Sequence, residues 1–527
     1  MYFPESFGNL KSLKSFKLEK GYDETFKEDA RKTKEPLFND VQNDDIIRLP
    51  ESFGGLFSLE ELSISGNIAP LPESFGNLRS LKNLGMSFWV SKESHLNDGA
   101  SWGGPAYAVN EFSALPESFG GLSSLECFSI DGGNIKTLPE SFGNLVALKI
   151  LSIENSHLES LPDSFGNLNN LESLDIDNGL KEQNAPLALP AAIGKLSNLK
   201  NLGINAALQP IPDWLGGLTS LTKLIITSDT ITVLPDSICT LPSLTEFFIN
   251  CNNLKALPDN IGNLKSLKEF HISSETLKTL PNSVGSLNSL EILLIEGSSF
   301  SSLPESIGNL QSLTRLYIYC ATIKTLPDTI GGLGKLEKIR LLRCNELESL
   351  PYSIGNLKSL KALYIRGGKM TALPESIGNI SSLEGIRLQY TQIASLPDSI
   401  GNLANLVSLG VCSSQNDPWY HEDAPPNYYE DEKTEKRSPF AGLPDSASKL
   451  VSLKFLELNN SEISILPDYL GNLPALVKIE IVNCAVKTIP PSIQRLVDSG
   501  ELILIKTEDE FIDLQHGHLE RKKPRRC

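Results

Sequence analysis

The sequence predicts an α/β solenoid, with parallel strands along one face and short helical turns along the other. Three observations lead to this prediction. A unit of 23 residues repeats almost unchanged, with Leu-Pro pairs at Leu234, Leu257, Leu280, Leu303 and Leu326 and again at Leu350. Each unit holds a short stretch of alternating apolar and polar residues, and each holds a proline-to-glycine segment that reverses the chain. Such a period is typical of a structure whose units pack only against their neighbours.

The first element of the unit is a strand, as in residues 244–249. Leu244, Phe247 and Ile249 occupy the first, fourth and sixth positions and are expected in the core, whereas the third, fifth and seventh positions face outward. Alternation with a period of two indicates a half-buried strand. Stacking then places one strand per repeat side by side in parallel. Outward residues about two dozen positions apart therefore become lateral neighbours.

The second element is a short helical turn, as in residues 257–264. We expect Pro258 at its first position, the carboxylate of Asp259 at its positive end, and Gly262 ending it in a left-handed conformation. Carboxylates recur at this post-proline position in many repeats. We interpret them as a structural file on the convex side and not as catalytic groups.

The Leu-Pro-x-x-Ile-Gly-x-Leu unit resembles the leucine-rich repeat family, most closely its 23-residue intracellular type, as in Ras-group proteins and their plant relatives. The resemblance extends from Phe3 to about Leu496. It implies an arc that binds proteins on its concave strand face. The family also has an asparagine after the strand that forms hydrogen bonds along the stack. This position holds Asn67 and Asn252 here, but Ser298, Ala321, Thr391, Ser461 and Cys484 elsewhere, so we expect an irregularity at Ala321.

The repeat pattern predicts one long domain. We assign residues 1–495 to a solenoid of about eighteen repeats and residues 496–527 to a C-terminal cap and basic tail. Long inserts near residues 19–48, 87–114 and 412–442 interrupt the period, each just after a strand. Residues 502–505 are expected to add a last strand. The first repeat opens at Met1 without a cap, which suggests missing upstream sequence.

Composition limits the function. The net charge of −17 argues against nucleic-acid binding, which requires a basic surface. No apolar run is long enough to cross a membrane, and no secretory leader precedes the first repeat, so we expect a cytoplasmic protein unless its true start is missing. Eight cysteines are dispersed singly, which fits a reducing compartment and small core or ladder positions. We expect a monomer with a protein partner.

No motif for catalysis, cofactor binding or metal binding is present in usable form. Phosphate-binding loops, dinucleotide fingerprints, zinc-protease motifs and kinase motifs are absent from the sequence. His516 and His518 form the sole close histidine pair, and further ligands are lacking nearby. We therefore expect neither an enzyme nor a cofactor or metal site.

The outward strand positions indicate a binding surface. The twelfth to fifteenth repeats place bases and aromatic residues there without an acid, whereas the fourth to sixth present Asp131, Glu154, Asp175 and Asp177 without a base. Arginine and tyrosine carry much of the energy of protein interfaces, so the basic and aromatic strip is our first choice for the partner site. The alternative is a solvated face whose charges neutralise each other. The predicted strip consists of Arg315, Tyr317, Tyr319, Lys338, Arg340, Tyr364, Arg366, Arg387 and Gln389.

Aromatic residues in the inserts form a second candidate surface. Trp89 and Trp102 lie in one insert, and Trp419 and Tyr420 lie in another. They either anchor a partner or fold back to hold their own loops.

Taken together, these observations favour a non-enzymatic scaffold that binds a protein partner, with a role in signalling or recognition suggested by analogy of fold. One alternative is the recognition or sensor part of a larger ubiquitin ligase, kinase or nucleotide-binding immune receptor. Another is a surface or adhesive protein, for which the sequon at Asn379 would permit glycosylation.

Overall fold

The computed structural model describes residues 3–18, 46–88, 112–178, 186–208, 210–412 and 438–507. The chain divides into two compact units, Met1–Ala321 (unit 1) and Thr322–Cys527 (unit 2). Most of the three long inserts predicted from the sequence lies outside the described residues.

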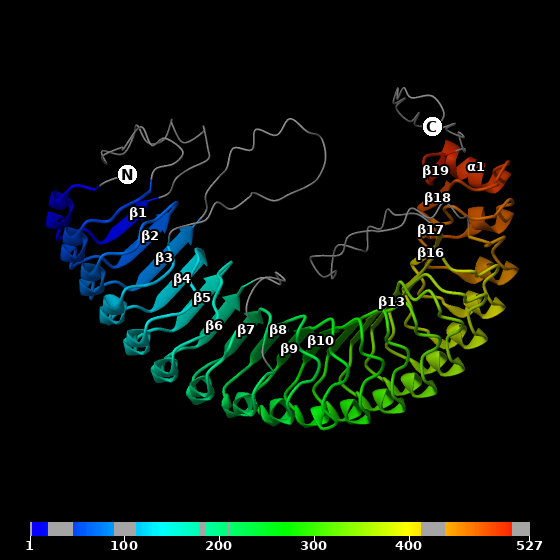
Figure 1. Cartoon of the computed structure of the whole chain (residues 1–527). Helices are drawn as coiled ribbons and strands as arrows, with labels where there is room; N and C mark the ends of the chain where they lie inside the picture. The colour runs from blue at the N-terminus through cyan, green and yellow to red at the C-terminus, as the bar shows by residue number, and fades with distance from the viewer. Residues whose placement is uncertain are drawn as a thin grey trace, which may run out of the picture. The chain divides into compact units, whose positions relative to one another are not determined.

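Unit 1 is a stack of parallel strands in chain order, each hydrogen-bonded to the next without a shift in register. The strands lie on the inner side of the stack and the helical turns on the outer side (Figure 1). The strands are β1 (Ser15–Leu18), β2 (Glu61–Ser65), β3 (Asn83–Phe88), β4 (Cys127–Gly132), β5 (Ile150–Glu154), β6 (Ser173–Asp177), β7 (Asn201–Asn205), β8 (Lys223–Thr227), β9 (Glu246–Asn250), β10 (Glu269–Ser273), β11 (Ile292–Glu296) and β12 (Arg315–Tyr319).

Unit 2 repeats the arrangement and ends in an α-helix followed by one more strand. Its strands are β13 (Lys338–Leu342), β14 (Ala362–Arg366), β15 (Gly385–Gln389), β16 (Ser408–Cys412), β17 (Phe455–Glu457), β18 (Lys478–Val482) and β19 (Ile503–Thr507), with α1 (Pro491–Asp498) before β19. The fold is therefore the predicted α/β solenoid. The expected last strand is present as β19, which pairs with β18.

The helical turns are 3-10 turns, one per repeat. In unit 1 they are η1 (Glu5–Asn9), η3 (Glu51–Gly55), η4 (Glu73–Asn77), η5 (Glu117–Gly121), η6 (Glu140–Asn144), η7 (Asp163–Asn167), η8 (Ala191–Lys195), η9 (Asp213–Gly217), η10 (Asp236–Thr240), η11 (Ile261–Asn263), η12 (Asn282–Ser286) and η13 (Glu305–Asn309). In unit 2 they are η14 (Asp328–Gly332), η15 (Tyr352–Asn356), η16 (Glu375–Asn379), η17 (Asp398–Asn402), η18 (Asp445–Lys449) and η19 (Asp468–Asn472).

The proline precedes the turn and does not open it, whereas the post-proline acid lies in the first turn as predicted and has a further role. Pro50 has extended backbone and precedes η3, and its carbonyl accepts the first hydrogen bond of the turn from Phe53 N–H at 2.9 Å. The carboxylate of Glu51 accepts a hydrogen bond at 3.2 Å from the backbone N–H of Ser74, in the next repeat. The acidic file therefore joins neighbouring turns, because the free N–H groups at the start of a turn lie within reach of the preceding repeat.

The turn glycines also have another role than the expected left-handed cap. Gly262 has no positive φ. A Cβ built on Gly355 would lie 2.4 Å from the carbonyl oxygen of Ser376 in the next turn, and similar contacts recur along both stacks. Glycine is favoured at most of these positions because the turns approach closely, although η10 and η18 carry Cys239 and Ser448 there.

Phenylalanine rings form a continuous stack beneath the first six turns of unit 1. Ring centroids of successive repeats are 5.9–6.2 Å apart, and their planes differ by 1° to 7°. From η8 onward, aliphatic residues such as Ile193 take the same position. Parallel rings at this spacing pack as a column that buries a large apolar area. The stacked rings are Phe7, Phe53, Phe75, Phe119, Phe142 and Phe165.

Hydrogen bonds along the stack are also formed after the strands, and we call this series the polar ladder. Its buried position is the one before the expected asparagine. Cys251 is fully buried, whereas the adjacent Asn252 donates to Asp229 Oδ1 at the surface, at 2.9 Å. At Ala321, the preceding Cys320 is buried and its thiol donates to the Phe300 carbonyl at 3.1 Å. At Ala321, where we expect an irregularity, the neighbouring Cys320 thiol thus supplies a hydrogen bond that alanine cannot.

We expect Gly355→Ala to lower the free energy of unfolding by about 1–3 kcal/mol, because the added methyl group overlaps the Ser376 carbonyl. Gly334→Ala is the matched control in the same unit, since a Cβ there meets no atom within 4 Å. Thermal unfolding followed by circular dichroism measures the difference. Equal melting temperatures for the two variants would contradict the close-contact explanation.

Candidate partner-binding face

The outward side chains of each unit form three columns that cross the strands. We call the row made by the fifth residue of each repeat the middle column. In unit 2, the register aligns Arg340 with Tyr364, Tyr364 with Arg387, Arg387 with Gly410, and Gly410 with Glu457. Residues far apart in sequence are thus lateral neighbours about 4.8 Å apart.

The predicted strip is divided between the two units. Arg315, Tyr317 and Tyr319 lie on β12 of unit 1, and the six other residues lie on β13, β14 and β15 of unit 2. Within unit 2, strand pairing brings the six residues together, since Arg366 is also aligned with Gln389.

The side chains of the strip differ in accessibility. Tyr317 and Tyr319 are each 4 % exposed, and Arg340, Arg387 and Gln389 are 7 %, 8 % and 2 % exposed. Arg315, Lys338, Tyr364 and Arg366 are half-buried. The half-buried group offers most of the accessible surface of the strip.

Arg387 takes part in a buried network that the sequence did not reveal. Its guanidinium forms a two-pronged ion pair with Glu457, from Nη1 to Oε2 at 2.8 Å and from Nη2 to Oε1 at 3.1 Å. The pair passes over Gly410, where a Cβ would lie 3.4 Å from the Arg387 side chain. Asn459 Nδ2 lies 3.0 Å from carboxylate oxygens of both Glu457 and Glu480. Glu457 lies on β17, two strands beyond the twelfth to fifteenth repeats on which the predicted strip was based.

Two further contacts order the exposed part of the strip. The Arg366 guanidinium lies over the Tyr390 ring, 5.3 Å from its centroid. The Tyr364 hydroxyl donates to Gln389 Oε1. Both contacts hold long side chains in place, which reduces the entropy lost when a partner binds.

The acidic residues of the fourth to sixth repeats are brought together in unit 1. Asp131, Glu154 and Asp177 are aligned across β4, β5 and β6. Burial raises the pKa of the Asp175 carboxyl, and the carboxylates of Glu154 and Asp177 raise it further, although much of its side chain is exposed. This part of the face therefore carries a concentrated negative charge.

An apolar run in the middle column was missed in the sequence. Register aligns Ile225 with Phe248, Phe248 with His271, His271 with Leu294, and Leu294 with Tyr317. The Phe248 and His271 rings meet edge to face with centroids 4.5 Å apart. Burial lowers the pKa of His271 to about 4, so its ring is neutral at pH 7. The sequence contains the signal for this run. It appears when all residues at the fifth position of each repeat are compared, and not only the charged ones.

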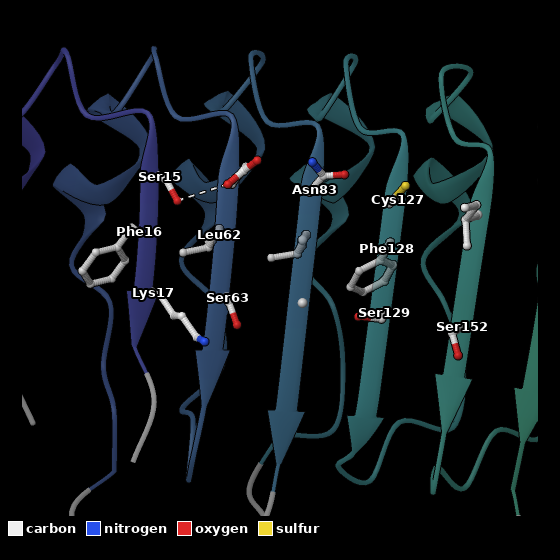
Figure 2. Close-up of a pocket in the computed structure, with 14 residues that line it drawn as sticks. Ser15, Phe16, Lys17, Leu62, Ser63, Asn83, Cys127, Phe128, Ser129 and Ser152 are labelled. Atoms are coloured by element: carbon white, nitrogen blue, oxygen red, sulfur yellow. Dashed lines mark hydrogen bonds between the residues drawn. The ribbon is translucent and has the colours of Figure 1, made fainter. Parts of the chain in front are cut away.

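A hollow of about 390 Å³ lies on the strand face of β1 to β5 (Figure 2). It is hollowed because the middle column on β2 to β5 consists of the small residues Ser63, Gly85, Ser129 and Ser152, next to Lys17 on β1. Sequence reasoning missed it as well, although the run of small residues at the fifth position was visible.

The model of a family described as leucine-rich repeat region matches residues 108–207, 142–253 and 270–349. The chain contains leucine-rich repeats. No curated protein sequence matches the chain.

Solved structures with similar folds share little sequence with these leucine-rich repeats. A leucine-rich repeat protein of Leptospira interrogans is 23 % identical, with a TM-score of 0.56 over 87 % of this chain and 92 % of that chain. A structure of the Toll–Spatzle complex of Drosophila matches at 16 % identity and a TM-score of 0.57, over 84 % of this chain and 53 % of that chain. At such identities the likeness concerns the fold alone.

Several other predictions concern residues or sites away from the strips. Trp89, Trp102, Trp419 and Tyr420 lie outside the described residues. Among the residues that are described, no group of three or more His, Cys, Asp or Glu side chains could hold a metal ion. Within the same residues, no helix is long and apolar enough to cross a membrane.

We expect Glu457→Gln to lower the free energy of unfolding by about 3 kcal/mol, because it leaves the buried Arg387 guanidinium without its counter-charge. Both side chains of the pair are at least four-fifths buried, with exposed fractions of 10 % and 17 %. Glu346→Gln, which removes an exposed ion pair with Lys369, should cost much less, because solvent screens exposed charges. Urea unfolding curves of both variants provide the comparison, and equal costs would argue against a buried, coupled pair.

Acid should weaken the fold through His271. Its folded pKa of about 4 lies below the ordinary 6.5, so the stability it contributes is complete above pH 6.5 and is lost as the pH falls toward 4. His271→Phe should therefore lose less stability than the wild type between pH 7 and pH 4.5, as measured by urea unfolding at each pH. His157→Phe, in the loop after β5, controls for the loss of a histidine. If His271→Phe lost as much stability in acid as the wild type, His271 would not be the cause of the pH dependence.

Proposed function

We propose that the chain is a non-enzymatic interaction scaffold whose strand face binds a protein partner. The observation that carries this proposal is the register of the strands, which gathers ordered side chains from successive repeats into continuous columns. Such a surface is broad and pre-organised, and both properties favour recognition of another protein. The Toll–Spatzle complex, a structure with a related fold, is itself an assembly of proteins.

The partner site that we propose is the predicted strip, with its accessible part in unit 2 as the main contact. Arg366 and Tyr364 offer a guanidinium and a ring held by neighbours, and Lys338 adds a second positive charge. A partner segment with acidic and aromatic side chains fits this combination, because arginine forks bind carboxylates and rings pack on rings. Arg315, Tyr317 and Tyr319 lie on β12 of unit 1 and form a separate part of the predicted strip.

We also propose a cytoplasmic role in signalling. The half-buried Cys127 thiol is free, and Cys239 and Cys251 are free and buried. Burial raises the pKa of Cys239 and Cys251 to about 12, which keeps these thiols protonated and unreactive. Free thiols in a solenoid of this size suit a reducing compartment.

The test is affinity purification with the intact chain, identification of the co-eluting protein, and calorimetric titration of that protein against variants. Lys338→Glu/Arg366→Glu should weaken its binding at least about tenfold, because two charges of the strip are reversed. Both side chains are half-buried, so charge reversal there disturbs the fold less than at the buried Arg340.

Lys487→Glu controls for the charge change, since Lys487 is exposed and follows β18 outside the strand face. Wild-type affinity in the Lys338→Glu/Arg366→Glu variant, with an unchanged melting temperature, would exclude the unit 2 strip as the site.

A further inference from the structure

The hollow of unit 1 has a shape and chemistry unlike the rest of the strand face. Its middle column carries Lys17 on β1 and then three serines and Gly85 on β2 to β5, whereas the same column on β8 to β12 carries Ile225, Phe248, His271, Leu294 and Tyr317. A Cβ on Gly85 would meet only the hydroxyls of Ser129, at 3.5 Å, and Ser63, at 3.9 Å. The space above Gly85 is therefore open because the side chains around it are short.

The hollow combines apolar and polar lining. Ile150 is 48 % exposed at its β5 end and offers an apolar surface. Hydroxyls of Ser63, Ser129 and Ser152 project along the middle column (Figure 2). Such a lining suits a long side chain with an apolar stem and a polar end.

The charge at the β4–β5 end of the hollow is negative. Asp131 and Glu154 lie two residues beyond Ser129 and Ser152 on the same strands, so they face the same way about 7 Å farther along. Asp131 accepts a hydrogen bond from Asn155 Nδ2 at 2.7 Å, and Glu154 accepts one from Ser152 Oγ at 2.9 Å. Both donors are neutral and leave the negative charge in place.

The opposite end of the hollow carries both signs of charge. Lys17 of β1 lines the hollow there, aligned with Ser63, and Glu61 of β2 lines it as well. The Glu61 carboxylate accepts a hydrogen bond from Ser15 Oγ at 3.3 Å. The paired acids Asp131 and Glu154 therefore make the β4–β5 end the more favourable one for a positive group.

We propose that the hollow and the adjacent carboxylates form one docking site for a basic, extended segment of a protein partner. The aliphatic stem of an arginine or lysine lies over Gly85 and against Ile150, and its cationic end reaches Asp131 and Glu154. Arginine is preferred, because its planar fork can bind two carboxylate oxygens at once. This inference rests on the proposed function as a protein-binding scaffold and adds a second site with the opposite preference in charge.

The probe is a fluorescein-labelled nonapeptide of alternating serine and arginine, titrated against the full chain by fluorescence anisotropy. A peptide with glutamate in place of arginine should not bind. Gly85→Leu should weaken binding of the arginine peptide about tenfold or more, because the new side chain fills the hollow without a close contact. Gly385→Leu is the matched control, as Gly385 lies on strand β15 with nothing near its Cβ.

The carboxylates are tested in the same assay. Asp131→Asn/Glu154→Gln keeps the hydrogen-bond acceptors but removes the charges, and should weaken binding at least tenfold and flatten its dependence on salt. Glu296→Gln, on β11, controls for loss of an acid on the strand face. A loss of affinity in this double variant without a loss in Gly85→Leu would show attraction to surface charge alone and would overturn the docking site.

Cys127 gives a second readout that needs no substitution, because its free thiol lines the hollow. The arginine peptide should slow alkylation of Cys127 by iodoacetamide several-fold, measured by mass spectrometry of the Cys127 peptide. Unchanged alkylation at a saturating peptide concentration would overturn the proposal. The scaffold function would still stand if a captured partner were sensitive to Lys338→Glu/Arg366→Glu, so the two failures are distinguishable.

Discussion

The close approach of successive turns is the constraint on which the rest of each stack depends. Most turn glycines lie against a serine carbonyl of the next repeat, so that a Cβ at Gly54 or Gly143 would come within 2.2 Å of that oxygen. This contact sets the spacing on the outer side, as the parallel hydrogen bonds set it on the inner side. Carboxylates such as Glu51 then reach the next turn and satisfy a backbone N–H that the short 3-10 turn leaves open.

A stack held at both edges allows the outward strand positions to vary from repeat to repeat. The middle column of unit 1 can thus change from small residues around Gly85 to the rings of Phe248 and His271 without altering the strands beneath. In unit 2 the same column carries the Arg387–Glu457 pair. The strands are uniform and only the outward side chains differ, so one solenoid can carry surfaces of opposite polarity.

The sequence predicted the solenoid and the strand register well, because the core positions and the period are local and repeat many times. It predicted the turn less well. The roles of Gly262 and of the post-proline acids depend on the neighbouring repeat, and a single unit cannot show them. The candidate site was hard to predict for the same reason. Arg387 and Glu457 are 70 residues apart, and their contact crosses the strand that carries Gly410. The hollow is formed by the absence of large side chains at Gly85 and the neighbouring serines. A search of the sequence for large and charged residues does not detect such a feature.

The phenylalanine column beneath the first six turns has an evolutionary consequence. Repeats within that block are interchangeable, since every ring meets another ring of the same tilt. Between η7 and η8 the buried side chain changes from the flat ring of Phe165 to the branched Ile193. A unit copied across this junction would therefore introduce a packing mismatch into the core. A copied unit is therefore accommodated more easily within the phenylalanine block than across this junction.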